Sequence, residues 1–348
     1  MLPSAVFPLL FAGVQAALTF KGVDWSSLLV EEAAGITYKT TGNVTVPLEQ
    51  ILVASGVNTV RQRLWVNPPD GNYNLEYNLK LAKRAQAVGL SVYLNLHFSD
   101  SWADPTKQVS PAAWPIDIGD LLRTVYQYTL DVSNAFAAAN IPLPIISIGN
   151  EITQGLLFPT GAKKSFYNLA SILHAASAGI KDSHLTPKPQ IMIHLDNGWK
   201  WDVQEAWYTS ALAAGPLSLD DFDIMAVSHY PFYNQSATLD KLETSLNNLA
   251  STWGKSIMLV ETDWPVACPS PKHPFPVDVS DIPFSAEGQT IWMRKLAAIV
   301  ASISRGDGLF YWEPMWINNP GLGSSCADNL MVDPTGVVRS SLEVFSSI

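Results

Sequence analysis

"SIGNE", residues 147–151, directly follows residues 141–146, an apolar stretch with the composition of a buried strand. The strand therefore ends in an amide and a carboxylate, Asn150 and Glu151. An unpaired carboxylate at the edge of an apolar core is costly. We therefore expect this pair to serve a purpose that involves polar groups from elsewhere in the chain.

Short apolar runs alternate with helical patterns on both sides of this stretch. Strands this apolar are typical of parallel sheets that are buried on both faces. Eight strand–helix units predict a single (β/α)8 barrel of the α/β class, with an open doubly wound sheet as the alternative. The expected strands are residues 18–25, 58–65, 91–98, 145–151, 190–195, 223–230, 256–261 and 309–312, and the expected helices are residues 47–55, 75–88, 118–139, 162–180, 203–213, 239–252 and 286–304, with a last short helix in the tail.

The composition limits the kinds of partner. The 348 residues carry a formal net charge of −10 and contain no basic run, which argues against nucleic acid or an anionic membrane. The 12 Trp residues suit sugar stacking, but they suit core packing equally well. We expect a monomer without a cofactor.

The N-terminal residues predict secretion. Residues 1–17 contain no charged side chain, and an apolar run precedes Val14-Gln15-Ala16, which resembles a cleavage site. We interpret residues 1–16 as a signal peptide and residues 17–348 as the catalytic domain. The run is too short to span a bilayer. The alternative to a signal peptide is that the run is the first buried segment of the domain.

Two further features agree with secretion. Asn43 and Asn234 each begin a glycosylation tripeptide. Cys268 and Cys326 are the only cysteines, and in an oxidising compartment we expect them to pair. Two free, buried thiols are the alternative.

Polar residues stand at the C-terminal end of every expected strand, where barrel enzymes build their sites. A single polar end follows from contact with water, but eight such ends would converge on one cleft. The ends carry Asp24, Arg61 and Arg63, His97 and Asp100, Asn150 and Glu151, His194 and Asp196, His229 and Tyr230, Glu261 and Asp263, and Glu313.

Glu151 and Glu261 are the two ends that indicate a reaction. They close the fourth and seventh strands, 110 residues apart, so they should face each other across the barrel mouth. Retaining glycosidases use two carboxyl groups about 5–5.5 Å apart. Arg61 or Arg63 and Tyr230 are candidates to keep Glu261 ionised. The alternative is a pair of unrelated surface glutamates.

Several stretches resemble a known family. They are residues 21–27, 60–68, 96–105, 148–151 and 260–265, of which residues 97–105, His-Phe-Ser-Asp-Ser-Trp-Ala-Asp-Pro, are the most specific. The chain resembles the clan A glycoside hydrolases and, more closely, the fungal endo-β-1,4-galactanases of glycoside hydrolase family 53. The resemblance covers essentially the whole mature chain.

The resemblance implies a barrel that hydrolyses β-1,4-galactan and type I arabinogalactan of pectin internally, with retention and without a cofactor. It implies that Glu151 is the acid/base and Glu261 the nucleophile. The residues that it implies for substrate binding are Arg61, His97, Asp100, Trp102, Asn150, His194, Asp196, Tyr230, Trp264 and Trp312. We expect the remaining Trp residues, Trp199 among them, to pack in the core or on helices, and we expect no role for Trp316.

Some family members carry calcium in the loops after the seventh and eighth strands. Cys268 and Cys326 lie in these loops, so we expect a disulfide to tie them instead, with Asp278, Asp281 and Asp328 as solvated charges. Two other functions stay open at this point. One is another clan A β-glycanase, acting on mannan, xylan or β-glucan, and the other is a sugar-binding barrel without turnover.

Overall fold

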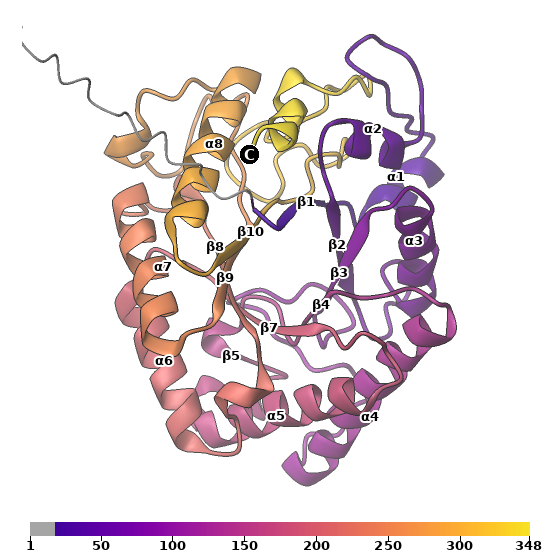
Figure 1. The fold of residues 1–348 in the computed structure, drawn as a ribbon, viewed down its shortest axis with the longest axis vertical. Helices are drawn as coiled ribbons and strands as arrows, with labels where there is room; N and C mark the ends of the chain where they lie inside the picture. Colours follow the sequence, from indigo (N-terminus) through magenta and orange to yellow (C-terminus); the bar gives the residue numbers. More distant parts are fainter. Residues whose placement is uncertain (1–17) are drawn as a thin grey trace, which may run out of the picture.

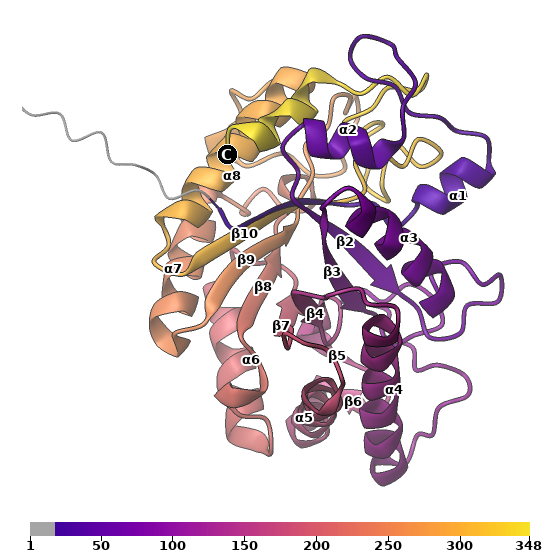
Figure 2. The ribbon, with the colours of Figure 1, turned by 45° about the vertical axis from the view of Figure 1, so that its right-hand side comes forward.

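The computed structural model describes residues 18–348, so the expected signal peptide lies outside the described residues. Eight parallel strands close into a barrel in the order β1-β10-β9-β8-β7-β4-β3-β2. Figures 1 and 2 show the helices as a ring around these strands, which confirms the predicted (β/α)8 fold. The barrel strands are β1 Phe20–Asp24, β2 Thr59–Leu64, β3 Ser91–Leu96, β4 Ile145–Ser147, β7 Gln190–Leu195, β8 Ile224–Ser228, β9 Ser256–Glu261 and β10 Gly306–Tyr311.

Four of the helices in residues 18–348 begin where a side chain caps the first turn. Asn74 accepts from the backbone N–H of Tyr77, and Asp117, Thr238 and Ser285 cap later helices in the same way. The α-helices are α1 Leu28–Ala33, α2 Leu48–Ala54, α3 Leu75–Ala87, α4 Ile118–Ala138, α5 Phe166–Asp182, α6 Trp201–Ala214, α7 Leu239–Trp253 and α8 Ala286–Ser302. Among residues 18–348, no helix is both long and apolar enough to cross a bilayer.

Two hydrophobic layers stabilise the barrel. Alternate strand residues form a small buried cluster, with Tyr93, Met192, Met258 and Phe310 among its members. The opposite faces of the strands join a much larger cluster with the helices. Side chains alternate across a strand, so the small cluster fills the inside of the barrel and the large cluster lies between barrel and helices.

The structure differs from the expected elements in several places. Helix α1 and the short antiparallel pair β5 Gly155–Leu156 and β6 Gly161–Ala162 were not expected. The short helix in the tail is a 3₁₀ helix, Ser340–Ser346, that packs beside α8 (Figure 1). Strand β4 ends at Ser147, four residues earlier than expected.

The early end of β4 positions the site. Gly149 has φ +133, and a Cβ there would lie 2.7 Å from Ile152 Cγ2, so the position requires glycine. Glu151 has φ +50, in the left-handed region that non-glycine residues seldom adopt. These turns take the chain out of the sheet and bring Asn150 and Glu151 over the barrel mouth.

Candidate active site

The two glutamates meet at the C-terminal mouth of the barrel. Glu151 follows β4 and Glu261 is the last residue of β9. One carboxylate oxygen of each, together with a ring nitrogen of His194, all lie within 4.8 Å of one another. Both side chains line a cleft of about 730 Å³. The expected opposition of the two carboxyl groups across one cavity is therefore present in the structure.

Arg61 anchors Glu261 from inside the barrel. Its guanidinium, on β2, donates to Glu261 Oε1 at 2.5 Å, to Asp24 Oδ2 at 2.6 Å and to Asn150 Oδ1 at 2.7 Å. Strand register puts Asp24 directly beside Arg61. Arg61 is only 1% exposed, so these charge-assisted bonds lie in a poorly solvated environment, where they are strong.

Tyr230 is the second donor to Glu261. Its hydroxyl lies 2.9 Å from Glu261 Oε2. Burial and the charge of Glu261 raise the pKa of Tyr230 well above its usual value, so the phenol stays protonated and can donate. Burial raises the pKa of Glu261, but Arg61 and the Tyr230 hydrogen bond both oppose that rise. Two donors thus favour an ionised Glu261.

Glu151 has the opposite environment. It is half-buried, and burial together with the charges of Glu261 and Asp196 raises the pKa of Glu151 well above its usual value. The nearest cation, Arg61, is already bound to Asp24, Asn150 and Glu261. Two carboxyl groups this close do not both stay ionised, so the proton of the pair belongs on Glu151.

His97 and Asn150 line the floor of the cleft. The Trp65 indole N–H and the Ala103 backbone N–H both donate to His97 Nδ1 at 3.2 Å, which leaves the ring hydrogen on Nε2. Burial and the nearby Arg61 and Arg63 lower the pKa of His97 well below its usual value, so the ring is neutral.

Four indole rings line the cleft. Trp102 and Trp312 line it as expected, and Trp316 and Trp199 line it as well, although the sequence did not indicate them. The rings of Trp102 and Trp316 are stacked, with centroids 6.0 Å apart and an interplanar angle of 22°. This arrangement presents flat apolar faces next to the two carboxyl groups.

A buried ion pair packs against two of these indoles, Trp102 and Trp316. The Arg63 guanidinium lies 4.4 Å from the Trp102 ring centroid and 4.2 Å from that of Tyr73, and it is paired with Glu313. Glu313 also accepts from the backbone N–H and hydroxyl of Ser27. Burial raises the pKa of Glu313 to about 7, although Arg63 opposes the rise. Arg63 therefore packs against Trp102 and Trp316, whereas Arg61 binds Glu261.

Four of the residues expected to contact substrate have other surroundings. Trp264 is fully buried, and its indole N–H donates to the Pro283 carbonyl at 2.9 Å, so it is not a sugar contact. The Asp100 carboxylate accepts the backbone N–H groups of Asn67 and Ala112 and does not line the cleft. Arg61 and His194 are buried beneath the cleft and contact other site residues.

Asp196, by contrast, lines the cleft, as expected. Burial raises the pKa of its carboxyl group. Ser228, at the end of β8, also lines the cleft, although the sequence analysis did not select it. It stands immediately before His229-Tyr230, and its position at a strand end was the available signal.

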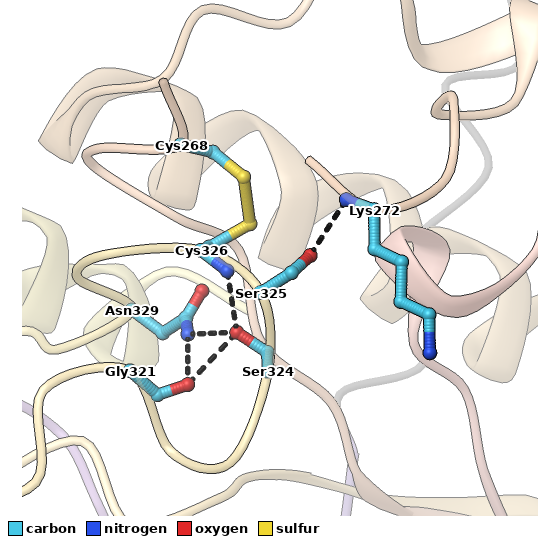
Figure 3. Close-up of a disulfide and its surroundings, with 7 residues drawn as sticks. All are labelled: Cys268, Lys272, Gly321, Ser324, Ser325, Cys326 and Asn329. Atoms are coloured by element: carbon cyan, nitrogen blue, oxygen red, sulfur yellow. Dashed lines mark hydrogen bonds between the residues drawn. A yellow bond between two sulfur atoms is a disulfide. The ribbon is translucent and has the colours of Figure 1, made fainter. Parts of the chain in front are cut away.

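A disulfide between Cys268 and Cys326 joins the loops that follow β9 and β10 (Figure 3), which confirms the expected pairing. Beside it, the Lys272 backbone N–H donates to Ser325 Oγ at 2.9 Å, and Asn329 Nδ2 donates to the Gly321 carbonyl at 2.9 Å. Leu322 and Gly323 of the same loop line the cleft, so the bridge also holds part of its rim.

Of the three acidic residues expected to be solvated charges, Asp281 is exposed, but Asp278 and Asp328 have partners. Asp328 is paired with Arg339 at 2.7 Å, and Asp278 Oδ2 accepts the Leu239 backbone N–H at 2.6 Å. Within residues 18–348, Glu151, His194 and Glu261 are the one group with metal-ligand spacing. The Arg61 cation and the Tyr230 hydroxyl already occupy the Glu261 oxygens, so this donor set does not fit a metal ion.

Comparison with known proteins agrees with this geometry. The model of glycosyl hydrolase family 53 matches residues 20–345. The arabinogalactan endo-β-1,4-galactanase of Humicola insolens is 58% identical over 332 residues, which cover 95% of this chain and 100% of that protein. A solved structure of a fungal β-1,4-galactanase superimposes with a TM-score of 0.95 at 58% identity, over 95% of this chain and 100% of that one. The family 53 catalytic domain of Ignisphaera aggregans superimposes with a TM-score of 0.83 at 30% identity and 99% coverage of both chains. The chain therefore belongs to glycosyl hydrolase family 53.

Proposed function

We propose that this glycoside hydrolase cleaves internal β-1,4-galactosidic bonds of galactan and type I arabinogalactan by double displacement, with retention. The observation that carries the proposal is the spacing of the carboxyl groups, since one oxygen of Glu151 and one of Glu261 lie within 4.8 Å of each other. Retaining enzymes need about 5–5.5 Å, whereas inverting enzymes leave roughly 6.5–9.5 Å for a water molecule. The short spacing supports attack by a carboxylate over attack by water.

Glu261 is the proposed nucleophile. Arg61 and Tyr230 hold its two oxygens and favour the ionised form, which attacks the anomeric carbon. Glu151 is the proposed acid/base, because its protonated form can donate to the departing glycosidic oxygen. Once the galactosyl-enzyme has formed, ionised Glu151 takes a proton from water, and that water releases the sugar from Glu261. No cofactor enters either step.

The remaining cleft residues are proposed substrate contacts. Asn150 Nδ2 donates one hydrogen to the Ala103 carbonyl at 2.9 Å, which leaves its second hydrogen for a sugar hydroxyl. The His97 Nε2–H and the Asp196 carboxyl are placed to bind further hydroxyls. Trp102, Trp312 and Trp316 offer apolar faces to sugar rings.

Galactan is the proposed substrate because the relatives described above are named as galactanases. Mannan, xylan and β-glucan are the rival substrates. The test is release of reducing ends by the purified enzyme from each polymer, with viscosity followed in parallel. Rapid loss of viscosity on galactan, with little release from the others, is expected. Faster release from another polymer would overturn the substrate, and no release from any polymer would favour a binding barrel without turnover.

The cellular setting is also a proposal. We infer that residues 1–16 are a signal peptide, that residues 17–348 form the secreted catalytic domain, and that it acts as a monomer. Asn43 is exposed on a turn, and Asn234 is half-buried with its Oδ1 bound to the Ser236 N–H, so both remain proposed glycosylation sites. Mass spectrometry of the secreted protein tests the N-terminus and the glycans together.

A further inference from the structure

Three buried side chains donate hydrogen bonds to the backbone carbonyl groups of the turn that presents Glu151. Glu151 has φ +50 and ψ +48, a conformation that persists only where surrounding contacts fix it. The donors are Ser147 Oγ to the Gly149 carbonyl at 2.7 Å, Gln108 Nε2 to the Asn150 carbonyl at 2.8 Å and the Trp207 indole N–H to the Ile152 carbonyl at 3.2 Å. The turn is therefore held by β4, by the loop after β3 and by α6, and none of these donors has a part in the reaction described above.

Gln108 acts on the peptide bond that leads directly into Glu151. The carbonyl group of Asn150 and the N–H and Cα of Glu151 belong to one planar peptide unit. A hydrogen bond that fixes this carbonyl therefore fixes the plane, and it constrains the direction in which the Glu151 side chain leaves the backbone. The Gln108 amide thus acts on the proposed acid/base through its backbone.

The same amide contacts the rim of the cleft. Gln108 Nε2 donates its other hydrogen to the Asp104 carbonyl at 3.0 Å, and Asp104 lines the cleft. Exchanging the two ends of the amide would set its oxygen against two carbonyl oxygens, so its orientation is unambiguous. Within residues 18–348 the buried Gln108 Oε1 meets no donor, so the contacts of this amide are those of its N–H groups.

Gln108 is itself held in place. Its backbone carbonyl accepts the Phe158 backbone N–H at 2.7 Å. Just before it, Asp104 and Lys107 exchange two backbone hydrogen bonds of 2.9 and 3.0 Å, which close a tight turn. The Gln108 side chain is also buried. A donor held in this way determines the position of the carbonyl that it contacts and does not simply follow it.

We propose that Gln108 is a positioning residue that aims Glu151 at the departing glycosidic oxygen by holding the Asn150 carbonyl. The role of Glu151 as acid/base rests on the proposed function. Loss of the amide N–H groups leaves the Asn150 carbonyl without this donor and allows the strained turn to relax. A displacement of about 1 Å at a reacting group can cost on the order of 100-fold in rate. Proton donation by Glu151 should therefore suffer, whereas attack by Glu261, on β9, should not.

Gln108→Met tests this role, because it keeps the length of the side chain and removes its N–H groups. The assay compares kcat/KM for phenyl and 2,4-dinitrophenyl β-galactobioside, since phenolate needs a proton to leave and dinitrophenolate does not. The loss should be on the order of tenfold to 100-fold for the phenyl substrate and less than about threefold for the dinitrophenyl substrate. The ratio of the two values does not depend on the fraction of the enzyme that folds. Equal losses on both substrates would overturn the proposal.

Gln204→Met is the matched control. Gln204, on α6, is also buried, and its Nε2 donates to the Asp196 and Asn197 carbonyls at 2.8 and 3.3 Å. Asn197 also has a positive φ, +51, but this turn follows β7 and does not carry Glu151. Gln204→Met should therefore keep the wild-type ratio of the two kcat/KM values, even if it lowers both. A ratio that changes equally in both variants would refute a role specific to Gln108.

Two further measurements separate this inference from the proposed function. Glu151→Ala should lose the phenyl substrate selectively, and more strongly than Gln108→Met. Equal losses in Glu151→Ala would refute the acid/base role itself, whereas a selective loss there but not in Gln108→Met would refute only the role of Gln108. A crystal structure of Gln108→Met needs no activity. It should show the turn at Asn150 and Glu151 displaced by about 0.5 Å or more with Glu261 unmoved, and a superimposable turn would overturn the proposal.

Discussion

Tyr230→Phe removes one hydrogen bond from the proposed nucleophile and leaves the ring in place. The Tyr230 hydroxyl donates to Glu261 Oε2 at 2.9 Å inside a buried site. A hydrogen bond to a charged group contributes about 1.5–3 kcal/mol, and one pH unit corresponds to about 1.4 kcal/mol. Because the bond favours the ionised form, its loss should raise the pKa of Glu261. We expect a rise of roughly one unit, near the lower limit, since Arg61 remains bound.

The assay is the pH dependence of kcat/KM on galactan for the wild type and the variant. The acidic limb reports ionisation of the nucleophile in the free enzyme, so it should move to higher pH while the basic limb stays. Tyr233→Phe is the matched control, because its ring lies 5.6 Å from that of Tyr230 and also lines the cleft. An acidic limb that does not move in Tyr230→Phe, or that moves equally in Tyr233→Phe, would refute the reasoning.

Three further predictions concern stability and binding. Cys268→Ala/Cys326→Ala removes a bridge that spans 58 residues, which should lower the free energy of unfolding by roughly 4 kcal/mol through chain entropy. Calorimetry should show a melting point lower by about 6 °C, and an unchanged melting point would contradict this. Trp316→Ala removes an indole face proposed to cover a sugar ring. A loss of about 60 Å² of apolar contact should weaken binding by about 1.5 kcal/mol, so KM for galactan should rise about tenfold with kcat little changed. An equal loss in kcat would instead indicate a role in the reaction step. Arg63→Met leaves Glu313 buried without its cation, so the free energy of unfolding in urea should fall by about 3–5 kcal/mol. Arg63→Met/Glu313→Gln should recover most of this loss. A double variant as unstable as the single one would show that the guanidinium acts mainly through the indoles.

The sequence was sufficient for the barrel because its strands are apolar and separated by long amphipathic helices. The strands at residues 190–195 and 256–261 have the expected boundaries. Helix α1 was missed because its six residues are too few for a helical period to be visible. The end of β4 was misplaced because Ile145-Ile146-Ser147-Ile148 has the composition of a continuing strand, and only the left-handed conformation of Glu151 reveals the turn.

The site was predictable where the fold alone decides it. Parallel strands in a barrel bring their C-terminal ends together, so Glu151, Glu261, Asn150 and Tyr230 had to meet once the strand ends were known. The Trp residues in the loops were not predictable in this way. Trp264 and Trp316 both follow strand ends, but the path of each loop determines which indole faces the cleft.

Those paths depend on long-range contacts. The Trp264 backbone N–H donates to the Tyr311 hydroxyl at 3.0 Å, and its indole N–H donates to Pro283, which holds the ring inside. Trp316 is held over Arg63 by a cation–π contact of 5.3 Å. Neither contact is visible as a period or a spacing in the chain.

The most direct test of the proposed chemistry is to trap the covalent intermediate. A 2-deoxy-2-fluoro galactosyl or galactobiosyl fluoride should inactivate the enzyme. The 2-fluorine slows both formation and hydrolysis of the glycosyl-enzyme, but the good fluoride leaving group speeds its formation, so the intermediate accumulates. Mass spectrometry of a peptic digest should then show one added sugar, on Glu261. Label on Glu151 or another carboxylate, or turnover of the reagent with inverted configuration and no label, would contradict the double displacement.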